Sequence, residues 1–156
     1  MIDIKQKLIK LSEEVAKYLD IDLIPMEYEN LKIDDNRLIL KPIPKIVINN
    51  KYEYNFIESA KCITHEMRHI YQIYYVNLMN DKHARIRKEE LAQAKSSANI
   101  NVNPNKYNDY SLQAIELDTF AFSQFYLRRY NVFFKYEDKK FQRLVEEYKK
   151  KYLYEI

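Results

Sequence analysis

Apolar residues recur every three or four positions in several stretches of the chain, and this spacing predicts amphipathic helices. One of these helices has a clear start. Asn55 stands where a helix N-cap would lie, and Glu58 follows it by three residues, which is the spacing of a capping box. The predicted helices cover residues 2–19, 56–79, 82–95, 111–130 and 138–153, and the helix at 82–95 is mostly charged.

Residues 21–54 have a different pattern, in which short apolar and polar alternations predict strands. The turn residues of 34–36 separate two such segments, and a third strand is expected at 45–48 after two prolines. The fold class is therefore α+β, with a small antiparallel sheet of two to four strands packed on a mainly helical core. A chain of 156 residues forms one domain of ordinary size, so we expect a single domain over residues 1–156.

Composition narrows the classes of function. The net charge is only +3, and basic and acidic residues are mixed, so no nucleic-acid partner is expected. No apolar run approaches the roughly 18 residues of a membrane helix, and the N-terminus has no apolar signal-peptide centre. A single cysteine, Cys62, excludes an internal disulfide and is expected to be a buried packing residue. These features predict a cytoplasmic protein without a membrane partner, and they leave its oligomeric state open.

The chain contains no glycine, and this absence excludes every motif that depends on one. Phosphate-binding P-loops, dinucleotide-binding turns, kinase glycine-rich loops and the nucleophile elbow all require glycine. The remaining chemistry must come from side chains that do not need a glycine-rich backbone.

One motif carries such chemistry: residues 65–69 have the sequence His-Glu-Met-Arg-His, within a predicted helix. Residues four apart share a helix face, so the imidazoles of His65 and His69 can reach one metal ion. Glu66 stands where it can act as general base on a metal-bound water. The motif therefore predicts a zinc site that is competent for hydrolysis.

A catalytic zinc takes three protein ligands, so a third is needed. The only other histidine, His83, lies in a charged run and is expected at the surface. Glu116 and Asp118 lie in a helix that is apolar on nearly all sides, where a carboxylate needs a partner or a metal. They are about 200° apart around the helix, so both cannot face the same ion. Glu116 has the longer side chain. Asp118 is the alternative ligand, or accepts a hydrogen bond from a ligand imidazole, an arginine or a tyrosine.

A histidine pair around a glutamate on one helix, with a glutamate on a later helix, resembles the gluzincin branch of the zincin metallopeptidases. Residues 64–72 and 115–122 are similar to short zincin-like proteins of bacterial and phage mobile elements, and more distantly to ImmA/IrrE-type peptidases. The resemblance covers residues 56–79 and 111–128. It implies a zincin-like fold, Zn²⁺ held by His65, His69 and Glu116, and Glu66 as general base.

The chain departs from the gluzincin pattern at one point. Many gluzincins have an aspartate four residues after the ligand glutamate, whereas position 120 is Phe and the acid comes at Asp118. Aligning Asp118 with that aspartate would put the ligand at Ala114, which cannot bind a metal.

The expected function is peptide-bond hydrolysis by a zinc-activated water, acting on a peptide or protein substrate. The region 37–48 is expected to align the peptide as an added strand, and the loop 96–110 to form a wall or lid. Tyr107, Tyr110 and Tyr126 are candidates for stabilising the oxyanion. Two other hypotheses remain: a zincin-like module from a phage or mobile element that binds metal without catalysis, and a helical domain in which the motif is fortuitous.

Overall fold

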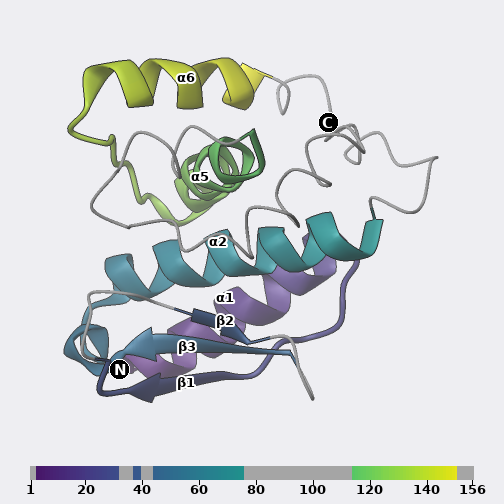
Figure 1. The fold of residues 1–156 in the computed structure, drawn as a ribbon. Coiled ribbons are helices and arrows are strands. Elements are labelled where there is room, and N and C mark those ends of the chain that lie inside the picture. The colour runs from purple at the N-terminus through teal and green to yellow at the C-terminus, as the bar shows by residue number, and fades with distance from the viewer. Residues whose placement is uncertain (1–2, 32–36, 40–43, 76–113, 151–156) are drawn as a thin grey trace. The chain divides into compact units, whose positions relative to one another are not determined.

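The computed structural model describes residues 3–31, 37–39, 44–75 and 114–150, and it divides into two compact units, Met1–Arg68 and His69–Ile156 (Figure 1). The described residues form an α+β structure of four α-helices and a three-stranded sheet, which confirms the predicted α+β class. The zincin-like fold stays a prediction. The helix predicted at 82–95 and the loop at 96–110 lie outside the described residues. The single domain stays a prediction.

In the first unit, helix α1 (Ile4–Leu19) follows the predicted boundaries closely. The Asp3 side chain caps it by accepting a hydrogen bond of 2.7 Å from the Gln6 N–H. The helix ends at Asp20, which has a left-handed backbone with φ of 54° although glycine is the usual residue there. Of the predicted apolar face, Leu8, Leu11 and Val15 are buried and Ile4 and Tyr18 are half-buried.

The sheet of the first unit has the strand order β1-β3-β2, formed by β1 (Met26–Glu29), β2 (Arg37–Ile39) and β3 (Lys45–Asn49). Strand β2 pairs with β3 in antiparallel register, but β1 pairs with β3 in parallel register. The prediction of an antiparallel sheet was therefore wrong for β1, and the sheet is mixed.

The physical reason for the mixed sheet is the burial of β3. Ile46, Val47 and Ile48 are consecutive, and all three are almost fully buried, so both faces of this strand are covered. A continuous apolar run favours the central position, with β1 and β2 as its two neighbours. The turn residues of 34–36 therefore do not join paired strands, because β1 and β2 lie on opposite sides of β3.

Helix α2 (Phe56–Tyr75) carries the histidine motif and passes from the first unit into the second. It begins at Asn55 as predicted, because the Asn55 side chain accepts a hydrogen bond of 3.1 Å from the Glu58 N–H. Its first turn is tied to the sheet by Ser59, whose Oγ lies 2.8 Å from the Tyr28 hydroxyl of β1. The Ser59 hydroxyl also donates to the carbonyl of Tyr52 at 2.9 Å. The predicted end of the helix, near residue 79, lies outside the described residues.

The second unit contains the end of α2, helix α5 (Ala114–Leu127), the 3-10 turn η3 (Arg128–Tyr130) and helix α6 (Lys139–Lys149). Helices α5 and α6 pack against each other. The ring of Phe120 meets that of Phe141 edge-on, with centroids 5.1 Å apart. The buried amides of Gln124 and Gln142 exchange two hydrogen bonds of 2.8 and 3.0 Å.

None of the described helices has the length and apolar character needed to cross a membrane.

Candidate metal centre

The two histidines of the motif lie one turn apart on α2, at the same side of the helix. Both side chains are partly exposed, and that of His69 has 13% of its surface accessible. The residues between them lie on other faces of the helix, and Met67 and Arg68 are buried. This is the arrangement that the four-residue spacing predicted.

Glu116 lies in the first turn of α5 and joins these histidines. Its Oε1 atom is 3.0 Å from His69 Nε2, and its side chain is only 5% exposed. One ligand atom from each of His65, His69 and Glu116 lies within 4.8 Å of the other two. The positive end of the α5 dipole also favours a carboxylate at this position. Residues 47 positions apart in sequence are thus brought together with the chemistry of a metal centre.

Gln72 connects His69 to Asp118. The Gln72 side-chain oxygen lies 2.9 Å from His69 Nδ1, and its amide nitrogen donates a hydrogen bond of 2.8 Å to Asp118 Oδ2. An ionised carboxylate only accepts hydrogen bonds, so Asp118 turns the amide oxygen of Gln72 towards His69. The imidazole must then donate from Nδ1. In the neutral tautomer this leaves the lone pair of Nε2 directed at the side where Glu116 lies.

Asp118 therefore reaches His69 through the Gln72 amide, a contact that the sequence did not suggest. A hydrogen bond to Asp118 from a ligand imidazole, an arginine or a tyrosine stays a prediction. Sequence reasoning missed Gln72. Its signal was a polar residue three positions after His69 in an otherwise apolar stretch, and the side chain is only 1% exposed.

The donor set fits a zinc ion in kind and in spacing. Two nitrogens and a carboxylate oxygen are a known catalytic set for zinc, and a fourth position remains for water. Ligand atoms at about 2.1 Å from a tetrahedral ion are roughly 3.4 Å apart. In the structure His69 Nε2 and Glu116 Oε1 are 3.0 Å apart, and the ligand atoms of the three residues all lie within 4.8 Å of one another. Small side-chain rotations would therefore bring them to the separation that the ion needs.

Glu66 follows His65 directly, and its side chain is partly exposed, as a group that must meet a substrate would be. One turn earlier, Cys62 is buried as predicted, with 6% of its surface accessible. Burial raises the pKa of the Cys62 thiol well above its usual value, and the nearby charge of Glu66 raises it further. Because a thiol binds metal as the thiolate, this cysteine is a poor competitor of the histidines for the ion.

Of the other candidates, only Tyr126 lies within the described residues. It is buried, and its ring lies 5.6 Å from that of Phe122 and 6.2 Å from that of Tyr130. Arg129 lies over the same ring at 5.0 Å. The Tyr126 ring is thus packed within the second unit, and its role in stabilising the oxyanion stays a prediction. His83, Tyr107 and Tyr110 lie outside the described residues.

Comparison with known proteins identifies no relative of this chain. The chain matches no protein-family model, and no curated protein or solved structure is similar to it at a significant level. The motif and the geometry around His69 are therefore the features that can indicate a function.

Proposed function

We propose that the protein is a zinc-dependent peptidase that hydrolyses peptide bonds by means of a zinc-activated water. The observation that carries this proposal is the convergence of His65, His69 and Glu116, with Glu66 next to His65 in the chain. Structural zinc sites usually have four protein ligands, so a set of three already favours an open, catalytic site. Glu66, on the same helix as the two histidines, adds the general base that hydrolysis needs.

Each residue has a defined task in this proposal. Zinc, when bound, lowers the pKa of its water towards about 7 and polarises a substrate carbonyl. Glu66 accepts the proton of the attacking water and delivers it to the leaving amine. Gln72 fixes the ring and the tautomer of His69, and Asp118 fixes the amide of Gln72.

The substrate in this proposal is an extended peptide. The expected strand-binding region was 37–48, but β3 is paired on both sides and cannot accept a further strand. Within that region only β2 is an edge strand among the described residues, so peptide pairing in this region must use β2.

The identity of the metal is tested first. Two histidines and one carboxylate also suit iron(II), so elemental analysis of protein purified without added metal must identify the ion. We expect about one equivalent of zinc per chain, and Glu116→Gln should reduce this content strongly. Glu147→Gln, an exposed change on α6, is the matched control and should retain the metal. Zinc content that survives Glu116→Gln unchanged would remove Glu116 from the site, and iron in place of zinc would overturn the peptidase.

Catalysis is tested by Glu66→Gln, which preserves the size of the side chain and removes the base. Cleavage of casein and of a fluorogenic peptide library should fall by about 100-fold or more while the zinc content is unchanged. Glu58→Gln on the first turn of the same helix, where the side chain pairs with Lys61 at 3.1 Å, is the control. Zinc-loaded protein that cleaves neither substrate would instead support the non-catalytic metal-binding module.

A further inference from the structure

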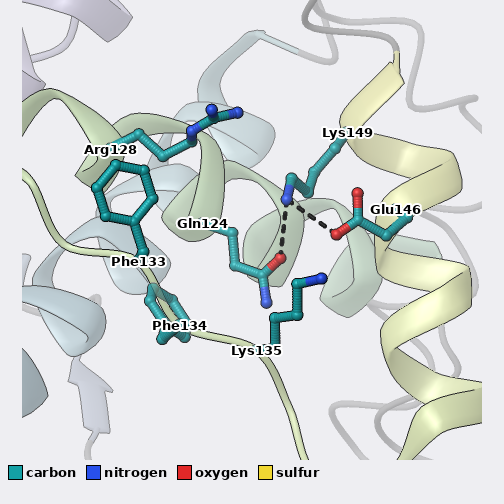
Figure 2. Close-up of a pocket in the computed structure, with 7 residues that line it drawn as sticks. All are labelled: Gln124, Arg128, Phe133, Phe134, Lys135, Glu146 and Lys149. Atoms are coloured by element: carbon teal, nitrogen blue, oxygen red, sulfur yellow. Dashed lines mark hydrogen bonds and ion pairs between the residues drawn. The ribbon is translucent and has the colours of Figure 1, made fainter.

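A pocket of about 460 Å³ lies in the second unit, formed by α5, η3, α6 and the segment between η3 and α6 (Figure 2). Its volume is within the range of small-molecule sites in proteins. None of its lining residues belongs to the metal centre. The lining residues are Gln124, Arg128, Phe133, Phe134, Lys135, Glu146 and Lys149.

The lining of this pocket is strongly cationic. Arg128, Lys135 and Lys149 are opposed by a single acid, Glu146, so the formal net charge of the lining is +2. Lys149 is already engaged, because its ammonium donates to Glu146 at 3.0 Å and to the Gln124 amide oxygen at 3.2 Å. Within the part of the chain that the structure describes, neither Arg128 nor Lys135 forms an ion pair. In Figure 2 their charged groups lie on either side of the Lys149 ammonium.

The pocket also offers an aromatic surface. Phe133 is 67% exposed, so its ring is open to contact with a ligand. The Arg128 guanidinium lies over this ring, 5.7 Å from its centroid. An exposed ring beside an arginine is a surface on which a flat aromatic ligand can stack.

We propose that this pocket binds a small phosphate ester that carries a flat aromatic group, which is the chemistry of a nucleoside monophosphate. A phosphate monoester has a charge of about −1.5 to −2 at neutral pH, which balances the charge of the lining. Arg128 and Lys135 bind the phosphate oxygens by charge-assisted hydrogen bonds. The base stacks on Phe133, and the Gln124–Lys149–Glu146 contacts hold the floor of the pocket in place.

These cations could instead serve only to neutralise the partial negative charge at the C-terminal ends of the helices. Arg128 follows the last turn of α5 and Lys149 ends α6, where positive side chains offset the negative end of a helix dipole. This role accounts for two of the three cations. It does not account for Lys135, which lies outside both helices, or for the exposure of Phe133.

The proposal is tested by titrating AMP, adenosine and inorganic phosphate into the full-length protein, with binding followed by calorimetry and by amide chemical shifts. We expect saturable binding of AMP at one site, with shifts centred on residues 124–135 and 146–149. Adenosine and phosphate should each bind about 10-fold more weakly or not at all, because each lacks one of the two interactions. Equal binding of phosphate and AMP would exclude the stacking role of Phe133, and no binding of AMP would overturn the proposal.

Matched variants separate this pocket from the metal centre, which could also bind a phosphate. Arg128→Gln and Lys135→Gln should each weaken AMP binding by about 10-fold or more. Arg129→Gln and Lys150→Gln change neighbouring cations that do not line the pocket, so they should leave AMP binding unchanged. Glu116→Gln should also leave it unchanged. If Glu116→Gln abolished AMP binding while Arg128→Gln did not, the nucleotide would bind at the metal and the proposal would be wrong. Failure of the peptidase proposal would not affect any of these outcomes.

Discussion

Helices α5 and α6 pack against each other, but they differ in how much of their surface is buried and in where their charged residues lie. Helix α6 has one buried stripe, represented by Phe141 and Val145, and charged residues elsewhere. Helix α5 is buried on nearly every side, and its charged residues Glu116 and Asp118 are no more exposed than Leu117. Most charges of α6 are exposed to water, whereas those of α5 depend on partners that the tertiary structure brings to them.

This contrast teaches where function can be sought. The charges of an amphipathic helix can be explained by water alone, so they carry little information about ligands. A buried carboxylate has no such explanation, and for Glu116 and Asp118 the described partners are His69 and Gln72 of α2.

Phe122→Ala tests whether α5 is a central core element. The side chain is fully buried, so its truncation should lower the free energy of unfolding by about 3–5 kcal/mol, as measured by urea denaturation. Phe133→Ala removes a ring of the same size that is 67% exposed, and it should change the free energy by about 0.5 kcal/mol or less. Similar losses for the two variants would contradict the burial of α5.

Gln72→Leu tests whether Asp118 of α5 orients His69 of α2 through the Gln72 amide. Removing the amide leaves His69 Nδ1 and Asp118 without their mutual link, so zinc affinity should fall by about 10- to 100-fold. Competition with a chelator gives the affinity, and thermal unfolding in excess chelator reports any loss of stability separately. Gln72→Glu keeps an acceptor for His69 but sets a second buried carboxylate against Asp118, so it should not restore the affinity. A variant that loses stability but keeps its zinc affinity would leave Gln72 with a packing role only.

Asp138→Ala tests the local signals of α6. The Asp138 side chain caps this helix by accepting a hydrogen bond of 2.8 Å from the Phe141 N–H. Its removal should lower the free energy of unfolding by about 0.5–2 kcal/mol, and Asp138→Asn should restore most of the loss. Zinc affinity should be the same in all three proteins, because α6 contributes no ligand.

Glu146→Gln should produce the smallest effect, visible only in the pH dependence of stability. Burial acts to raise the pKa of Glu146, but hydrogen bonds from Lys149 and Gln142 and the charge of Lys135 together hold it below its ordinary value of 4.5. A carboxyl with a lowered pKa stabilises the folded state above its ordinary pKa, and this contribution is lost as the pH falls through the lowered value. The free energy of unfolding, measured by denaturation between pH 6 and about 3, should therefore fall less steeply with decreasing pH for the variant. An unchanged slope would mean that the contacts of Glu146 add nothing to stability.

The sequence predicted the parts of the fold that local signals determine. The caps at Asn55 and the apolar faces of α1 and α6 were recognisable because each depends on residues three or four positions apart. The parallel pairing of β1 with β3 was not recognisable, because short strands contain no information about which neighbour they will meet.

The candidate site was predictable to a similar degree. The histidine pair followed from helical spacing, and Glu116 followed from the cost of burying a carboxylate. The role of Gln72 could not be derived, because it depends on the simultaneous placement of His69 and Asp118, which are 49 residues apart in the chain. Such three-body contacts are a property of the folded structure alone.

The left-handed residue Asp20, together with Asn131 at φ of 58°, occupies a place that most chains give to glycine. A protein that closes its helices without glycine retains a side chain at every backbone position. A side chain narrows the denatured ensemble and favours folding by roughly 0.4–1 kcal/mol, but only where the native backbone suits that residue. At these two left-handed positions the side chain also strains the folded backbone, so each helix end gives up stability that a glycine would have kept.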